Sequence, residues 1–324
     1  MSENLIVALP SKGRLQEKTQ DFFAKAGLKI ERPGGDRNYR GNIKGIDGLE
    51  IAFLSASEIA REIAAGTVHF GVTGTDLVRE NIDRPEEKTH IVTPLGFGHA
   101  DVVIAVPKAW IDVTSMTDLA DVASDFRARH GTRMRIATKY VNITRQFFAS
   151  HGILDYRIVE SAGATEGAPA AGAAEMIVDI TSTGSTLEAN ALKVPDDGVM
   201  MKSQAHLVAS LTADWSEKNL DVARQILDQI AAQDEAHKLK EVRCSVRAPA
   251  EIASEAATKF GCTAPFGTPS ESVLILHCPS KAVAECANWL RARGAPLVSV
   301  AGLDYVFTTD NPLFDPLKHR VTGS

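Results

Sequence analysis

Short apolar runs alternate with helical segments along the first two thirds of the chain, and this alternation constrains the fold more than any other feature. Residues 5–9 and 49–54 are typical of buried strands because they are short and almost wholly apolar. Residues 58–65 have helical periodicity and lead into another apolar run at residues 68–72. This order predicts an α/β unit with a parallel sheet.

The pattern breaks at residues 93–98, and a second unit of the same kind begins at residues 101–106. It continues through helices expected near residues 118–129 and 142–151 to an apolar run at residues 176–180. Two such units predict two lobes with a ligand-binding cleft at the carboxyl ends of their strands. The expected boundaries are residues 1–96 with 192–216 for lobe I and residues 97–191 for lobe II.

The last third has a different organisation. Residues 217–310 contain strand and helix patterns in an order close to βαββαβ, which is typical of a small ferredoxin-like domain. Residues 311–324 are expected to be a tail, because Pro312 and Pro316 argue against regular structure. The expected fold class is therefore α/β, with a two-lobed part like periplasmic binding proteins of type II and a small ferredoxin-like C-terminal domain.

Composition excludes several function classes. The 324 residues carry a net charge of −6, which disfavours a general nucleic-acid binder. No segment approaches a membrane span, and no basic region precedes the first apolar run, so we expect a first strand there and a cytoplasmic protein. The four cysteines, all in the last third, form no C-x-x-C pair, so buried free thiols are expected and a zinc site is not. The cysteines are Cys244, Cys262, Cys278 and Cys286.

The most informative motif follows the apolar run at residues 176–180. Asp179 lies at the end of that run, and small hydroxyl residues surround one glycine directly after it. Backbone N–H groups and hydroxyls of this kind bind phosphate, although a hydrophilic turn has the same composition. Glu166, one small-residue segment upstream, favours a site, because two carboxylates at one mouth suit the hydroxyls of a sugar. The loop comprises Thr181, Ser182, Thr183, Gly184, Ser185 and Thr186.

Residues 166–187 resemble the signature region of ATP phosphoribosyltransferase, the enzyme that opens histidine biosynthesis. In that family the loop holds the 5-phosphate of phosphoribosyl pyrophosphate (PRPP), and the two acids face its ribose hydroxyls. The resemblance therefore implies these roles for the loop, for Glu166 and for Asp179. The matching residues are Glu166, Gly172, Ile177, Asp179, Thr183, Gly184, Thr186 and Leu187, followed by Glu188, Ala189 and Asn190.

Other segments resemble the family on the ATP side. Lys12, Gly13 and Arg14 follow the first strand, where the family has a Lys-Gly-x-Leu pattern, and an anion would complement them. Asp76 ends a Gly-x-x-Gly-x-Asp-Leu pattern, although it is equally suited to cap a helix. Residues 95–98 resemble the family's hinge. Thr138 and Tyr140 lie where the family has a strand ending at the cleft, and a cap with a packed aromatic explains them equally well.

One position departs from the family. An arginine that would bind the ligand's phosphates usually follows the strand that ends here at Leu54, and this chain has Ser55. The basic residues available to replace that arginine are Arg37, Arg40 and Lys44.

The resemblance implies a complete activity. N1 of ATP would attack C1 of the PRPP ribose and release pyrophosphate, with Lys12, Glu166 and Asp179 as the catalytic residues. Mg²⁺ would arrive with the substrate, without a dedicated protein site. The C-terminal domain implies the family's long form, which assembles as homodimers or homohexamers and is inhibited by L-histidine.

Three alternatives stay open. The first is a small-ligand-binding protein of the same fold, and the second is a non-catalytic or weakly catalytic regulatory relative. The third is a phosphoribosyltransferase that uses another nucleophile.

Overall fold

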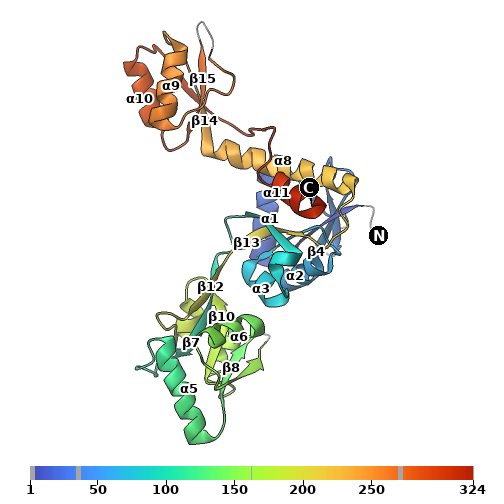
Figure 1. Cartoon of the computed structure of the whole chain (residues 1–324), viewed down its shortest axis with the longest axis vertical. Coiled ribbons are helices and arrows are strands. Elements are labelled where there is room, and N and C mark those ends of the chain that lie inside the picture. The colour runs from blue at the N-terminus through green and yellow to red at the C-terminus, as the bar shows by residue number, and fades with distance from the viewer. Residues whose placement is uncertain (1–3, 34–37, 162, 269–272, 324) are drawn as a thin grey trace. The chain divides into compact units, whose positions relative to one another are not determined.

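The computed structural model describes residues 4–33, 38–161, 163–268 and 273–323, and the chain divides into two compact units (Figure 1). The first unit comprises Met1–Asp21 with Glu31–Ser216, and the second comprises Phe22–Ile30 with Glu217–Ser324. Among the described residues, no helix is both long and apolar enough to cross a membrane.

A seven-stranded sheet, in the order β2-β3-β4-β1-β5-β13-β6, organises the start of the first unit. Its centre is parallel, because β1 pairs in parallel with both β4 and β5, as the alternating pattern predicts. Strand β13 is antiparallel to both of its neighbours, β5 and β6. The strands are β1 (Leu5–Pro10), β2 (Ile30–Glu31), β3 (Arg40–Ile43), β4 (Leu49–Leu54), β5 (Phe70–Gly74), β6 (Thr89–Pro94) and β13 (Ala205–Ser210).

Helix α2 (Ala56–Ala65) packs on one face of this sheet through Ile59 and Ile63. Ser55 accepts a hydrogen bond from the Glu58 N–H, and the Glu58 carboxylate accepts one from the Ser55 N–H, so a capping box begins the helix. Gly66 ends it in the left-handed conformation. The other helices of this part are α1 (Gly13–Lys25), α3 (Thr75–Asn81) and α4 (Pro85–Lys88).

The second sheet of this unit has the order β11-β7-β10-β8-β9, with β12 also paired to β7. Helices α5 (Met116–His130) and α6 (Val141–Ser150) contribute Leu119 and Phe148 to its buried core. The strands are β7 (Ala100–Pro107), β8 (Met134–Thr138), β9 (Tyr156–Glu160), β10 (Met176–Thr181), β11 (Leu192–Lys193) and β12 (Val199–Ser203).

The sequence analysis assigned residues from 192 onward to lobe I, but the strand pairing assigns residues 192–203 to the second sheet. Both β11 and β12 pair with β7, and Met200 and Met201 pack against the core of the second sheet. The chain returns to the first sheet only at β13.

The chain passes between the two sheets at two connections, which we call crossings, and backbone hydrogen bonds join these crossings to each other. At the first crossing, between β6 and β7, Gly96 and Gly98 have φ of 73° and 69°, a region that glycine adopts without strain. The second crossing is the short connection between β12 and β13. Leu95 N–H donates to the Ala205 carbonyl at 3.0 Å, and Ala205 N–H donates to the Phe97 carbonyl at 3.0 Å. The predicted hinge residues 95–98 therefore lie at the junction.

The larger segment of the second unit begins with the long helix α8 (Glu217–Lys238), which leads into a small α/β domain. Its sheet has the antiparallel order β15-β14-β16, and Figure 1 shows α9 and α10 on one side of it. A single bridge between Thr263 and His277 lies where a ferredoxin-like fold has its second strand, and residues 269–272 are outside the described part. The elements are β14 (Leu239–Cys244), α9 (Pro249–Phe260), β15 (Leu274–Pro279), α10 (Val283–Ala292) and β16 (Val298–Gly302).

The expectation of an irregular tail after residue 310 is wrong. Helix α11 (Phe314–Thr322) lies beside α8 and buries Phe314 and Leu317. The Asn311 side-chain oxygen accepts the N–H groups of Leu313 and Phe314 at 2.7 and 2.9 Å. Pro316 fits because it lies in the first turn, where a helix needs no N–H donor.

Candidate active site

The site begins where β10 leaves the core of the second sheet. Met176, Ile177 and Val178 are buried, whereas Asp179 is half-buried at the exposed end of the strand. Strands β8 and β10 are parallel neighbours, so their carboxyl ends meet at one edge of the sheet. Residues that follow either strand therefore contribute to one pocket.

That pocket has a volume of about 450 Å³ and unites most of the predicted PRPP residues. Glu166 lies in the short helix η1 (Thr165–Gly167), and Asp179 and the hydroxyl loop lie at the end of β10. Gly184 and Ser185 belong to the same loop but do not line the pocket. The described lining residues are Lys139, Gly163, Ala164, Thr165, Glu166, Asp179, Ile180, Thr181, Ser182, Thr183, Thr186 and Leu187.

Hydrogen bonds shape the loop from within. Thr181 Oγ1 accepts the Gly184 N–H at 2.9 Å, and the Thr183 and Ser185 hydroxyls are 2.9 Å apart. Gly184 has φ of 75°, which lets the chain turn tightly before helix α7 (Ser185–Ala189). The loop is thus held in a compact turn, and the exposed Ser182, Thr183 and Thr186 offer hydroxyls to a ligand.

The surroundings of Asp179 affect the protonation of its carboxyl group. Burial raises the pKa of Asp179, and the neighbouring Glu166 carboxylate raises it further. The Ile180 N–H, which donates to Asp179 at 2.8 Å, acts in the opposite direction, as does Lys139, whose Nζ lies 4.0 Å from the carboxylate. Hydroxyl donors of a bound sugar would replace the water that Asp179 loses.

The sequence reasoning missed two parts of this pocket. Lys139 lies between two residues that were predicted, and its place directly after β8 was the signal for it, because β8 and β10 end at the same edge. The segment of Gly163, Ala164 and Thr165 forms one wall. Ala164 has φ of 50°, an uncommon conformation for a residue with a Cβ.

Asp76, Thr138 and Tyr140 are brought together, but none of them lines the pocket. The Tyr140 hydroxyl donates to the Asp76 carboxylate at 2.9 Å, and the Ser203 hydroxyl donates to it at 2.6 Å. Burial and the Asp76 charge raise the pKa of Tyr140, which keeps its proton. Thr138 is buried and accepts the Tyr140 N–H at 2.8 Å. These contacts form a buried network between α3 and the β8 end.

A second contact between the same elements uses Glu80. Its carboxylate accepts the backbone N–H groups of Asn142 and Ile143, each at 3.0 Å. The Asn142 side-chain amide donates to the Glu80 carbonyl at 2.8 Å. Glu80 of α3 therefore caps the N-terminus of α6, which lies in the second sheet's lobe.

Lys12, Gly13 and Arg14 are exposed at the start of α1. Gly13 has φ of 73° and open space around its Cα, and the Ser11 N–H donates to the Leu54 carbonyl at 2.9 Å. These three exposed residues do not line the pocket at the end of β10.

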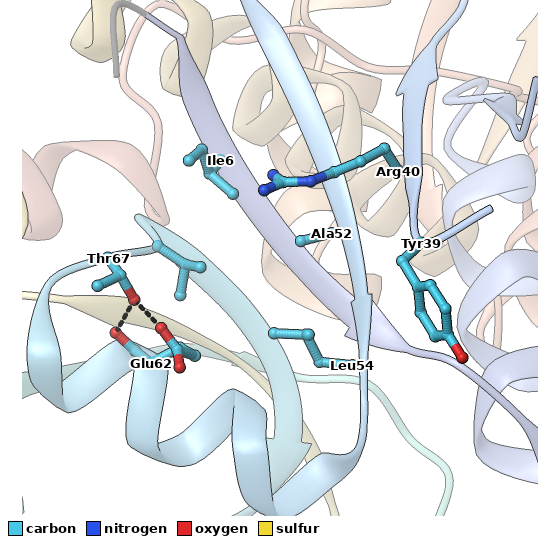
Figure 2. Close-up of a pocket in the computed structure, with 8 residues that line it drawn as sticks. Ile6, Tyr39, Arg40, Ala52, Leu54, Glu62 and Thr67 are labelled. Atoms are coloured by element: carbon cyan, nitrogen blue, oxygen red, sulfur yellow. Dashed lines mark hydrogen bonds between the residues drawn. The ribbon is translucent and has the colours of Figure 1, made fainter. Parts of the chain in front are cut away.

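The position of the missing family arginine has a structural role in this chain, because Ser55 caps α2. Of its possible replacements, Lys44 is exposed and Arg37 lies outside the described residues. Arg40 lines a separate pocket of about 290 Å³ beside α2, which Figure 2 shows. Arg40 is paired there with Glu50.

The floor of this second pocket is apolar, and Glu62 and Thr67 hydrogen-bond to each other at its edge (Figure 2). Apart from Arg40, it contains none of the residues that the sequence predicted for the site. The apolar floor consists of Ile6, Ala52, Leu54 and Val68.

The sequence predicts that no set of protein side chains alone coordinates Mg²⁺, and the structure shows which side chains could contribute to coordination. Among the described residues, the one group of three or more His, Cys, Asp or Glu side chains close enough to bind an ion is a cysteine group in the small domain. The pocket offers the two carboxylates of Glu166 and Asp179. Two carboxylates fit a Mg²⁺ ion that a substrate's phosphates also bind.

The fold and the pocket together define a two-lobed α/β protein with a pocket of carboxylates and hydroxyls at the carboxyl ends of parallel strands. A family model described as HisG, ATP phosphoribosyltransferase, matches residues 55–232. The chain is also 60% identical over 320 residues to an ATP phosphoribosyltransferase of Bradyrhizobium sp. (strain ORS 278), and the match covers 98% of each chain. The chain therefore belongs to the ATP phosphoribosyltransferase family of histidine biosynthesis.

Further relatives agree with this assignment. An ATP phosphoribosyltransferase of Rhodopseudomonas palustris (strain HaA2) is 58% identical over 319 residues, again 98% of each chain. A solved structure of the ATP phosphoribosyl transferase (HisG:HisZ) complex from Thermotoga maritima contains a chain with a TM-score of 0.53 and 25% identity. That match covers 70% of this chain and 95% of the other.

Proposed function

We propose that this enzyme transfers the 5-phosphoribosyl group of PRPP to N1 of ATP and releases pyrophosphate. The observation that carries the proposal is the pocket that unites Glu166, Asp179 and the hydroxyl loop at the end of β10. The pocket contains both kinds of group that a ribose 5-phosphate needs, carboxylate acceptors for the sugar hydroxyls and clustered donors for the phosphate.

Each part of the pocket has a proposed role. Asp179 and Glu166 accept hydrogen bonds from the ribose hydroxyls and fix the sugar so that C1 faces the attacking nitrogen. The loop from Thr181 to Thr186 binds the 5-phosphate through its hydroxyls and backbone N–H groups. Positive charge develops on the ribose as pyrophosphate leaves, and the two carboxylates stabilise it.

Lys139 adds a cation that the sequence reasoning did not assign. Its ammonium lies 4.0 Å from Asp179, at the edge of the pocket, and is half-exposed. We propose that it binds a phosphate oxygen of PRPP once substrate occupies the pocket.

The ATP side rests on a different set of residues. Lys12, Gly13 and Arg14 are proposed to bind phosphate groups of the substrates at the start of α1, with Lys12 also offsetting charge on the leaving pyrophosphate. Asp76, Thr138 and Tyr140 were predicted to bind ATP directly. Because they are buried and bonded to one another, we propose that they position the edge of the ATP site.

Mg²⁺ is the proposed metal. It would neutralise charge on the pyrophosphate and so improve it as a leaving group. Glu166 and Asp179 are the described carboxylates that would hold it together with substrate oxygens.

The second unit supports assignment to the family's long form. The Thermotoga chain matches 70% of this chain, whereas the present chain also includes the small β14–β16 domain. We propose that this domain replaces a separate regulatory subunit and that L-histidine inhibits the enzyme through it. The homodimer or homohexamer and the cytoplasmic location predicted from the sequence are further parts of this proposal.

An absorbance assay with ATP, PRPP and Mg²⁺ tests the reaction, with the product and the released pyrophosphate identified by mass spectrometry. We expect phosphoribosyl-ATP to form and added L-histidine to slow its formation. Tight PRPP binding without turnover would instead favour the regulatory relative, and turnover with another nucleophile would favour a different phosphoribosyltransferase. Turnover without a histidine effect would remove only the regulatory part of the proposal.

A further inference from the structure

Three cysteines far apart in the sequence meet in the small domain. The sulfur atoms of Cys262, Cys278 and Cys286, which we call the cysteine trio, all lie within 4.8 Å of one another. Cys262 follows α9, Cys278 lies in β15 and Cys286 lies in α10, so three elements contribute one sulfur each. All three residues are at most 2% exposed.

The spacing of one pair of these sulfurs matches tetrahedral metal coordination, and the third sulfur lies within 4.8 Å of both. Zn–S bonds are about 2.3 Å long, so two sulfurs on one tetrahedral zinc ion are about 3.8 Å apart. Cys262 Sγ and Cys286 Sγ are 3.8 Å apart. A disulfide would need these atoms to approach to about 2.05 Å, which the present arrangement does not provide.

The surroundings of the trio also bear on metal binding. Three thiolates without a cation would be costly in this apolar core, so the sulfurs can bind as thiolates only together with a cation.

We propose that the cysteine trio is a structural site for a thiophilic divalent cation of the Zn²⁺ class. Binding replaces the three S–H protons, which pass to solvent, by three metal–sulfur bonds, and the complex of Zn²⁺ with three thiolates carries one net negative charge. A monovalent cation such as Cu⁺ would leave two negative charges buried, which favours the divalent ion. The site joins α9, β15 and α10, and the ion binds as the domain folds because the sulfurs are buried.

Metal analysis of the full-length protein, expressed with added Zn²⁺ and purified without chelator, tests the proposal. We expect about one zinc ion per chain in the wild type and less than about a tenth of that in Cys278→Ala. Cys244→Ala is the matched control, because Cys244 is a buried cysteine of the same core but not a member of the trio. It should keep about one ion per chain at saturation.

A second measurement avoids any dependence on variants that fold poorly. The wild-type protein, refolded anaerobically with Co²⁺, should show the strong near-ultraviolet sulfur-to-cobalt absorption of thiolate ligation. Folded wild-type protein with neither zinc nor this absorption would overturn the proposal. A loss of metal in Cys244→Ala equal to that in Cys278→Ala would overturn it as well. So would a wild-type mass lower by two hydrogens, which indicates a disulfide.

Discussion

Asp179, which we propose to bind the ribose of PRPP, has a carboxyl group whose charged form is disfavoured by its half-buried place in the fold. Burial raises the pKa of its carboxyl group above the ordinary value of 3.8. The folded protein therefore holds this proton more tightly than the unfolded chain does. The contribution of this carboxyl group to stability falls as pH rises above 3.8 and is smallest above the raised pKa. In the proposed role, binding of the ribose by the charged acid would compensate for this loss of stability.

Replacing that acid should separate stability from function. Asp179→Asn removes the buried charge, so we expect a higher melting temperature than the wild type at pH 7. The gain should shrink as pH falls toward 3.8, because the wild-type carboxyl then takes up its proton. Thermal unfolding across this pH range measures the difference, and a constant gain or a loss at pH 7 would contradict the assigned cause.

Tyr140 acts through a single hydroxyl. In Tyr140→Phe the buried Asp76 carboxylate keeps the hydrogen bond from the Ser203 hydroxyl. It loses the 2.9 Å hydrogen bond from the Tyr140 hydroxyl. An unsatisfied buried acceptor costs about 1–3 kcal/mol, so the free energy of unfolding should fall by about that amount. Denaturant unfolding measures it, with Tyr39→Phe as a control, because Tyr39 is 67% exposed. Equal losses in the free energy of unfolding for the two variants would show that the hydrogen bond between Tyr140 and Asp76 does not stabilise the fold.

At the scale of elements, the local signals in the sequence were reliable. The apolar runs that become β1, β4, β7 and β10 predicted those strands closely, because each is a short buried segment between polar ends. Elements whose existence depends on distant partners were missed. Strand β12 is fixed by pairing with β7, and α11 by packing on α8, and neither interaction is visible in a local pattern.

Helix α2 provides a prediction at this scale. Ser55→Ala removes one half of the capping box, so the free energy of unfolding should fall by about 1 kcal/mol. Ser115→Ala is the matched variant, since Ser115 and Asp118 form the same box at α5. Chemical denaturation of both variants measures the loss, and no change in either would show that the boxes do not stabilise the folded protein.

In the candidate site and among the cysteines, too, a local sequence pattern does not reveal contacts between segments that are distant in sequence. Residues contiguous in sequence, such as the loop after Asp179, could be predicted because their chemistry is local. Lys139 needed the knowledge that β8 and β10 are parallel neighbours. The cysteine trio was missed because sequence spacing carries no information about sulfurs that three packed elements bring together.

At the scale of the first unit, two sheets are linked by a pair of crossings and by the contacts of α3 with α6. If the proposed substrates bridge the lobes, their binding depends on the relative position of the two lobes. Contacts that fix this position therefore influence substrate binding without touching substrate.

Glu80→Ala tests that link. The variant removes the carboxylate that accepts the Asn142 and Ile143 N–H groups, so we expect a stability loss of about 1 kcal/mol and a larger effect on KM than on kcat. Glu87→Ala is the control, because Glu87 pairs only with Arg84 among the interactions described and is largely exposed. Unchanged KM values in Glu80→Ala would show that this contact does not position the lobes.

The most direct measurement of the central claim is kcat/KM for PRPP in Asp179→Asn beside Glu188→Gln. Glu188 lies in α7 near the same loop, but its side chain is exposed, pairs with Lys108 and does not line the pocket. We predict a fall of about 100-fold or more in Asp179→Asn, with Glu188→Gln within about twofold of the wild type. Wild-type kcat/KM in both variants would contradict the assignment of this pocket as the site where PRPP reacts.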